Sequence, residues 1–157
     1  MRTRLIDTGP FVAYLNRRDP EHKAVTPSLE GFQGQLVTTG AVVGEVMYFV
    51  SEIPNGPISL AKLLLSSNIR IAEIGRPAQV FAAAELMNKN SDAPMDFADA
   101  TLVLLAAEIG VTDIFTLDRR GFSTYRNAKG KGFRLFPNSL STSGPPVTTR
   151  TPGTRSF

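Results

Sequence analysis

Five acidic residues of this 157-residue chain lie in sequence contexts that a solvent-exposed surface does not explain. Asp7 and Asp118 each follow a short apolar run that is typical of a β-strand. Glu45 lies inside the apolar segment AVVGEVMYFV. Asp96 and Asp99 lie three residues apart in MDFADATLVLLAA, a spacing that places them on one face of a helix. If these carboxylates converge, they repel one another and require a positively charged partner.

A divalent cation is the simplest such partner. Two carboxylates about 4 Å apart repel by roughly 4 kcal/mol at an effective dielectric constant near 20, and a cation between them offsets this repulsion. Ligands that are all oxygen favour Mg²⁺ or Mn²⁺ over zinc. Such a site can activate water, shield a phosphate and stabilise a leaving oxygen, with one metal ion or with two. The acidic residues therefore predict hydrolysis of phosphodiester bonds.

Each acidic residue also has a structural interpretation. Asp7 and Asp118 are equally well explained as helix caps or turn residues. Asp96 is expected in the first turn of a helix that begins two residues earlier, where a carboxylate stabilises the helix dipole by roughly 0.3–1 kcal/mol. Glu45 and Asp99 are expected past the first turn and in apolar surroundings, where capping does not explain them. Because burial of an unpaired carboxylate costs several kcal/mol, these two residues carry the argument for a metal.

The pattern along the chain predicts the elements that position these residues. Strands are expected at residues 5–6, 36–38, 69–74, 111–117 and 133–136, and helices at 10–16, 41–52, 57–66, 77–90 and 94–109. A further helical region follows residues 17–20, and Pro27 is expected to interrupt or end it. This alternation predicts an α/β fold, a three-layer α/β/α sandwich with a central parallel sheet. Ligands of such sheets bind beyond the carboxyl ends of the strands, where Asp7 and Asp118 are expected.

Composition excludes several classes of protein. The chain is 42% apolar and 20% charged, as in a globular protein, and contains no cysteine, which excludes disulfides and thiol nucleophiles. No apolar run reaches the roughly 18 residues of a transmembrane helix, so no membrane contact and a cytoplasmic location are expected. A net charge of +3 is compatible with a polyanionic partner but is weak evidence for one. One domain is expected over residues 1–137, followed by a flexible tail rich in Ser, Thr, Pro and Gly over residues 138–157.

Four segments, in order, resemble the PIN-domain family, specifically the VapC-type toxin ribonucleases of bacterial toxin–antitoxin pairs. They are LIDTGPFVAYLNRRDPEH, LVTTGAVVGEVMYFV, MDFADATLVLLAAEIGVTDIFTLDRRGFSTYR and FRLFPN. The resemblance implies a PIN-like fold and a catalytic quartet that holds Mg²⁺ or Mn²⁺, formed by Asp7, Glu45, Asp99 and Asp118, with Asp96 as a further acid. It also implies cleavage of RNA by a metal-bound water, a cognate antitoxin that covers the acidic cleft, and a homodimer.

The resemblance extends to residues beside the acids. Thr8 and Thr116 match small hydroxyl positions often found next to such sites, and Thr39 matches the threonine that often opens the helix of the glutamate; for all three, helix capping is the simpler interpretation. Arg119 is the basic residue that we expect first to contact the RNA backbone, and a solvated surface position is its alternative. Gly121 stands where relatives often have a polar or acidic residue, so any contribution from that position is missing.

Two other functions are weighed against the nuclease. The main alternative is a non-catalytic RNA- or protein-binding module on a PIN scaffold, and the intact quartet argues against it. An aspartyl phosphatase of haloacid dehalogenase type is less favoured, because it needs an aspartate two residues after Asp7, where Gly9 stands. His22 is the only histidine, so mechanisms that rely on a histidine base have no obvious candidate. Apolar residues of segments 41–52 and 57–66 form a candidate dimer surface, although core packing explains most of them.

Overall fold

A parallel sheet of five strands forms the centre of the molecule in the computed structural model, which describes residues 1–90 and 92–138. The strands are β1 (Thr3–Ile6), β2 (Gln35–Thr39), β3 (Ile69–Ala72), β4 (Asp113–Phe115) and β5 (Arg134–Phe136). Every neighbouring pair is parallel, in the order β3-β2-β1-β4-β5. The expected α/β fold with a central parallel sheet is therefore confirmed. The tail expected over residues 138–157 lies outside the described residues, except for Asn138.

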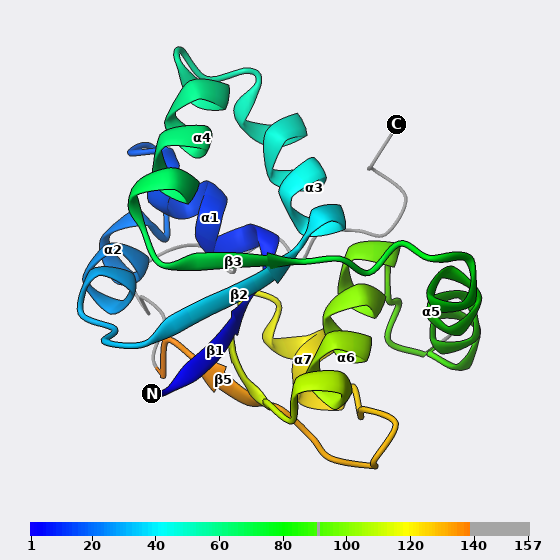
Figure 1. Ribbon diagram of the computed structural model, residues 1–157. Helices are drawn as coiled ribbons and strands as arrows, with labels where there is room; N and C mark the ends of the chain where they lie inside the picture. The colour runs from blue at the N-terminus through cyan, green and yellow to red at the C-terminus, as the bar shows by residue number, and fades with distance from the viewer. Residues whose placement is uncertain (91, 139–157) are drawn as a thin grey trace.

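Helices cover both faces of this sheet. They are α1 (Thr8–Leu15), α2 (His22–Glu30), α3 (Gly40–Val50), α4 (Gly56–Ser66), α5 (Pro77–Lys89), α6 (Phe97–Ile109) and α7 (Arg119–Thr124). Figure 1 shows α1 to α4 on one side of the sheet and α5 to α7 on the other. This separation follows from right-handed crossovers, because the chain moves from β1 to β3 in one direction across the sheet and then returns to β4 on the far side of β1.

The reversal of strand order creates a switch point between β1 and β4. Helices that follow these two strands leave toward opposite faces of the sheet, and ligands of such sheets bind beyond the carboxyl ends of the strands at this point. Asp7 directly follows β1, and Thr116 directly follows β4. Their main chains are joined by the hydrogen bond from the Asp7 amide to the Phe115 carbonyl, 2.9 Å long. The candidate site residues of these two strands thus lie side by side.

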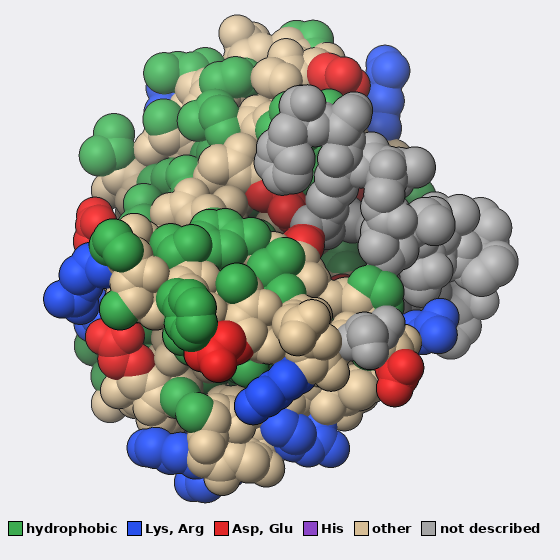
Figure 2. Space-filling model, turned by 90° about the vertical axis from the view of Figure 1, so that its right-hand side faces the viewer, with side chains coloured by type: hydrophobic (Ala, Val, Ile, Leu, Met, Phe, Trp, Pro, Cys, Tyr) green, Lys and Arg blue, Asp and Glu red, His purple; other side chains and the backbone are tan. Residues whose placement is uncertain are grey.

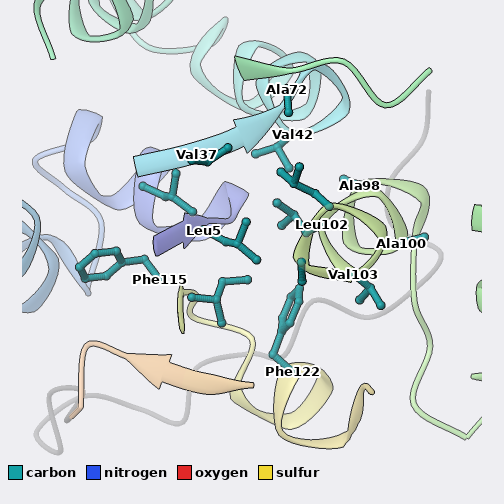
Figure 3. Close-up of a cluster of buried hydrophobic side chains, with 14 of the residues drawn as sticks. Leu5, Val37, Val42, Ala72, Ala98, Ala100, Leu102, Val103, Phe115 and Phe122 are labelled. Atoms are coloured by element: carbon teal, nitrogen blue, oxygen red, sulfur yellow. The ribbon is translucent and has the colours of Figure 1, made fainter. Parts of the chain in front are cut away.

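The hydrophobic core holds α6 firmly against the sheet. Most of α6 is buried, because the helix contacts β2, α3 and α5. Figure 3 shows Leu102 of α6 gathered with Leu5 of β1 and Val37 of β2, and all three side chains are fully or almost fully buried. This packing fixes the position of the first turn of α6, which carries two of the candidate carboxylates.

Most element bounds differ from the sequence prediction by one or two residues, and three differences are larger. Helix α2 continues through Pro27, which was expected to interrupt or end it. The proline lies in the second half of the helix and removes only one amide hydrogen, while the final turn is closed by the bond from the Gly31 amide to the Pro27 carbonyl. Helix α6 begins at Phe97 instead of residue 94, and α7 was not predicted. Among the described helices, none has the length and apolarity that crossing a membrane would need.

Candidate active site

Four helices begin at the carboxyl edge of the sheet, and each is preceded by a polar residue at its N-cap. These residues are Asp7 before α1, Thr39 before α3, Asp96 before α6 and Asp118 before α7. Figure 2 shows the molecule from the side toward which the strands point in Figure 1, with acidic side chains recessed near the centre of this face and Lys and Arg side chains along its lower part. Helix N-termini carry partial positive charge, which favours carboxylates at this edge.

Asp7 is held by Thr116 across the switch point. The aspartate is 6% exposed, and its Oδ2 accepts a hydrogen bond of 3.0 Å from the Thr116 hydroxyl. The same hydroxyl oxygen accepts a bond of 3.0 Å from the Asp118 amide. Thr116 therefore joins Asp7 to the main chain of Asp118, two members of the expected quartet.

Asp96 and Asp99 form a reciprocal capping box at the start of α6. The Asp99 amide donates to Asp96 Oδ1 at 2.7 Å, and the Asp96 amide donates to Asp99 Oδ2 at 3.2 Å. The prediction that capping does not account for Asp99 is wrong, because the helix starts three residues later than expected and Asp99 falls in its first turn. The cap uses one oxygen of each carboxylate, and Asp99 is 6% exposed.

Asp118 caps α7 and does not directly follow the strand, as was expected, because the strand ends two residues earlier than predicted. Strand β4 ends at Phe115, and Asp118 Oδ1 accepts a bond of 3.0 Å from the Gly121 amide. The capping interpretation of Asp118 is therefore confirmed. The carboxylate remains at the switch point, since its amide is bound to Thr116.

Tyr125 lies near three of the candidate carboxylates. Its side chain is fully buried, and its hydroxyl donates a hydrogen bond of 2.7 Å to the Pro94 carbonyl. Burial raises the pKa of the Tyr125 hydroxyl, and the negative charges of Asp99, Asp118 and Asp7, in this order, raise it further. These three aspartates come from three separate segments of the chain, and all lie close enough to this hydroxyl for their charges to act on it.

Glu45 occupies a less apolar position than the sequence suggested. Only one stripe of α3 is buried, at Val42, Val46 and Val50, and Glu45 itself is half-buried, while Tyr48 on the same helix is 53% exposed. The sequence predicted that Glu45 is buried, whereas its side chain is half-buried. Helix α3 nevertheless contacts α1, which begins directly after Asp7, and α6, which carries Asp99 in its first turn.

Two buried polar atoms, on the residues that directly follow Asp7 and Asp118 in the chain, have no hydrogen-bond partner among the described residues. They are Thr8 Oγ1, on the first residue of α1, and Arg119 Nη2, on the first residue of α7. Thr8 was expected as a cap but follows the cap position, which Asp7 occupies. Thr39, in contrast, does cap α3: its hydroxyl accepts a bond of 3.3 Å from the Val42 amide. Unsatisfied buried polar atoms are costly, and a bound ligand would satisfy them.

The donor set fits a hard cation, although the ligands are not gathered around one point. Within residues 1–90 and 92–138, no three histidine or acidic side chains form a group that could hold a metal ion. The carboxylates instead make cap and threonine hydrogen bonds. Their donors are all oxygen, as Mg²⁺ and Mn²⁺ prefer, and the residues that follow Asp7 and Asp118 each carry a buried polar atom with no hydrogen-bond partner among the described residues. A cation at this place would have to draw the carboxylates closer together.

Sequence reasoning missed Tyr125 as a site residue. The sequence shows an aromatic residue four positions after Gly121, and nothing in the local pattern distinguishes it from an ordinary core residue. Only the tertiary structure shows that its hydroxyl bonds the Pro94 carbonyl, which lies 31 residues earlier in the chain and shortly before α6.

Comparison with known proteins gives one family. Residues 4–128 match the family described as PIN domain. A curated relative, "Ribonuclease VapC26" of Mycobacterium tuberculosis, is 33% identical over 135 residues, which is 85% of this chain and 99% of the relative.

Solved structures share the fold at lower sequence identity. The M. tuberculosis toxin VapC20, described as cleaving the sarcin-ricin loop, superposes with a TM-score of 0.65 at 17% identity, over 72% of this chain and 87% of that one. VapBC2 from Rickettsia felis, bound to a promoter DNA fragment, gives 0.57 at 15% identity, over 85% and 97%. FitAcB from Neisseria gonorrhoeae gives 0.54 at 20% identity, over 74% and 88%.

Proposed function

This chain belongs to the PIN domain family, and from that premise we propose that it is an endoribonuclease that uses Mg²⁺ or Mn²⁺ to hydrolyse phosphodiester bonds in RNA. The curated relative at 33% identity is named a ribonuclease and is matched over 99% of its length, which supports the same reaction here. The observation that carries the proposal is the position of Asp7 and Asp118 at the switch point of the sheet, where the Thr116 hydroxyl joins the Asp7 carboxylate to the Asp118 main chain.

The residues that would hold the cation are Asp7, Asp99 and Asp118, joined by Glu45 from α3. Asp96 is the less favoured fifth ligand, because its carboxylate caps the first turn of α6. When bound, the cation would activate water and offset the charge that develops on the phosphate. The protein holds these ligands in place, because most of α6 is buried in the core and the Thr116 hydroxyl is hydrogen-bonded to both the Asp7 carboxylate and the Asp118 amide.

The RNA backbone would be bound by side chains that border the carboxylates. The unsatisfied Arg119 Nη2 and Thr8 Oγ1 flank the site on α7 and α1, and an arginine donor matches a phosphate oxygen well. Such contacts fix the position of the strand without reading its bases. Thr116 would act on Asp7 through its hydrogen bond rather than on RNA. Arg119 and Thr8 are therefore the proposed substrate-binding residues.

A protein partner is part of this proposal. The chain would be the toxin of a toxin–antitoxin pair, and its RNA cleavage would be blocked by a cognate antitoxin that covers the acidic face; the R. felis neighbour VapBC2 and the toxin VapC20 support this role. A homodimer is also proposed. Exposed apolar side chains on the predicted surface, Tyr48 on α3 with Ile58 and Leu65 on α4, support it.

The test is cleavage of a structured RNA by the purified chain with Mg²⁺, with Mn²⁺ and with EDTA. We expect defined fragments with either metal, no fragments in EDTA, and recovery of cleavage when metal is added in excess of the chelator. Binding of RNA that gives no fragments under any of these conditions would favour the alternative, a non-catalytic binding module. Fragments that persist in EDTA would contradict metal dependence.

A further inference from the structure

Gly121 lies against two polar groups of the site, which leave no room for a side chain at this position. A Cβ atom added at Gly121 would collide with Asp118 Oδ2 and would lie 2.9 Å from the Tyr125 hydroxyl oxygen. These contacts place the Asp118 carboxylate and the Tyr125 hydroxyl on the same side of α7, around the bare main chain of the glycine. Asp118 is already oriented by the Gly121 amide through its other oxygen, Oδ1. Its carboxylate is thus confined from two directions.

Tyr125 connects this end of α7 to the start of α6. The hydroxyl hydrogen is used in the bond of 2.7 Å to the Pro94 carbonyl, two residues before the Asp96 cap. The ring cannot move aside, because it is fully buried and packs edge-to-face on Phe122 at 5.1 Å, and Phe122 in turn packs on Phe133 at 5.4 Å. A single side chain therefore fixes the segment that leads into α6 against α7.

The geometry points to Tyr125 as a positioning residue for the candidate metal site. We propose that its hydroxyl sets the separation between Asp118 on α7 and the Asp96–Asp99 pair on α6, and that Gly121 is required for it because any side chain there would displace Asp118 or the hydroxyl. The part of this inference that concerns metal affinity rests on the proposed function. The part that concerns the arrangement of α6 and α7 does not.

The test compares Tyr125→Phe with wild type in two measurements. Titration of Mn²⁺, followed by calorimetry and by the shift in melting temperature relative to each metal-free protein, is expected to show affinity lowered roughly tenfold, as for other residues that orient metal ligands. Hydrogen exchange in metal-free Tyr125→Phe is expected to be faster than in metal-free wild type at the Asp99 and Gly121 amides, which the two caps protect. Exchange at the Leu5 amide in the sheet is expected to be the same in both proteins.

Tyr14→Phe is the matched control. It removes the same atom from a tyrosine of α1 whose hydroxyl donates a hydrogen bond to Glu30 of α2. Neither residue belongs to the candidate metal site. We expect neither Mn²⁺ affinity nor exchange at the caps to change. Gly121→Ala is expected to weaken Mn²⁺ binding as Tyr125→Phe does, since it displaces Asp118 directly.

Each outcome decides one part of the inference. Faster exchange at both caps together with weaker Mn²⁺ binding in Tyr125→Phe supports the positioning role. Wild-type exchange at the caps, or wild-type affinity for Mn²⁺ in a protein whose Asp99→Asn variant has lost it, overturns that role. If wild type itself binds no Mn²⁺, the proposed function fails, and the exchange at the two caps alone decides whether Tyr125 positions α6 against α7.

Discussion

Replacing Asp99 with asparagine is expected to lower the rate of RNA cleavage roughly 10²–10³-fold, the loss typical when one electrostatic contribution to a transition state is removed. The substitution separates charge from capping. The asparagine oxygen can still accept the Asp96 amide, which Asp99 Oδ2 accepts at 3.2 Å in wild type. We therefore expect α6 to start normally and the metal-free protein to melt no lower than wild type, because one source of repulsion among the three aspartates is gone.

Asp113→Asn provides a matched control for this prediction. Asp113 begins β4 at the opposite edge of the sheet, where its carboxylate forms a bidentate pair with Arg134. Such exposed pairs contribute little, so stability should fall by less than about 1 kcal/mol and cleavage should not change. Cleavage at the wild-type rate by Asp99→Asn would mean that Asp99 is only a cap. Equal losses in both variants would mean that the assay reports general damage.

Leu102→Ala is expected to lower the free energy of unfolding by roughly 2–5 kcal/mol, the largest effect on stability that we predict. Leu102 is fully buried where α6 meets the sheet (Figure 3), so the truncation leaves a cavity beneath the helix that carries Asp99. Urea denaturation followed by circular dichroism measures the change. Because the capping box lies one turn away, we also expect weaker cleavage at temperatures where the protein remains folded.

The same substitution on the surface is its control. Leu65 lies on α4 and is 88% exposed, so Leu65→Ala should change stability by no more than about 0.5 kcal/mol. A loss of several kcal/mol in Leu65→Ala would indicate that this side chain is buried in solution, as in the proposed dimer. A loss below about 1 kcal/mol in Leu102→Ala would contradict the described packing of α6.

The sheet was predictable because each strand is short and apolar, with a helical segment between most of them. The position of Asp7 followed from the end of the apolar run at Ile6, and β1 does end there. The short helix α7 was not predictable from periodicity, since six residues give less than two turns of pattern. Its only signal was Asp118 as a possible cap, which is also the signal of a turn.

The two residues that carried the metal argument from sequence proved less clear than expected. Asp99 was assigned past the first turn because Pro94 suits a helix start, whereas the capping box at Asp96 sets the actual start. Glu45 was expected to be buried because the residues next to it in the sequence are apolar. Neighbouring residues point in different directions around a helix, however, and only one stripe of α3 is buried. The tertiary structure supplied the stronger evidence, the hydrogen bonds through which Thr116 joins Asp7 to the Asp118 main chain.

The central claim is that one divalent cation binds between these aspartates at the carboxyl edge of the sheet. Anomalous diffraction from crystals of the chain soaked in Mn²⁺ tests it most directly. We predict a peak at an ordinary metal–oxygen distance of about 2.0–2.6 Å from carboxylate oxygens of at least two of Asp7, Asp99 and Asp118. A peak bound to other residues, or no peak at saturating Mn²⁺ while the three carboxylates keep their cap and threonine hydrogen bonds, would contradict it.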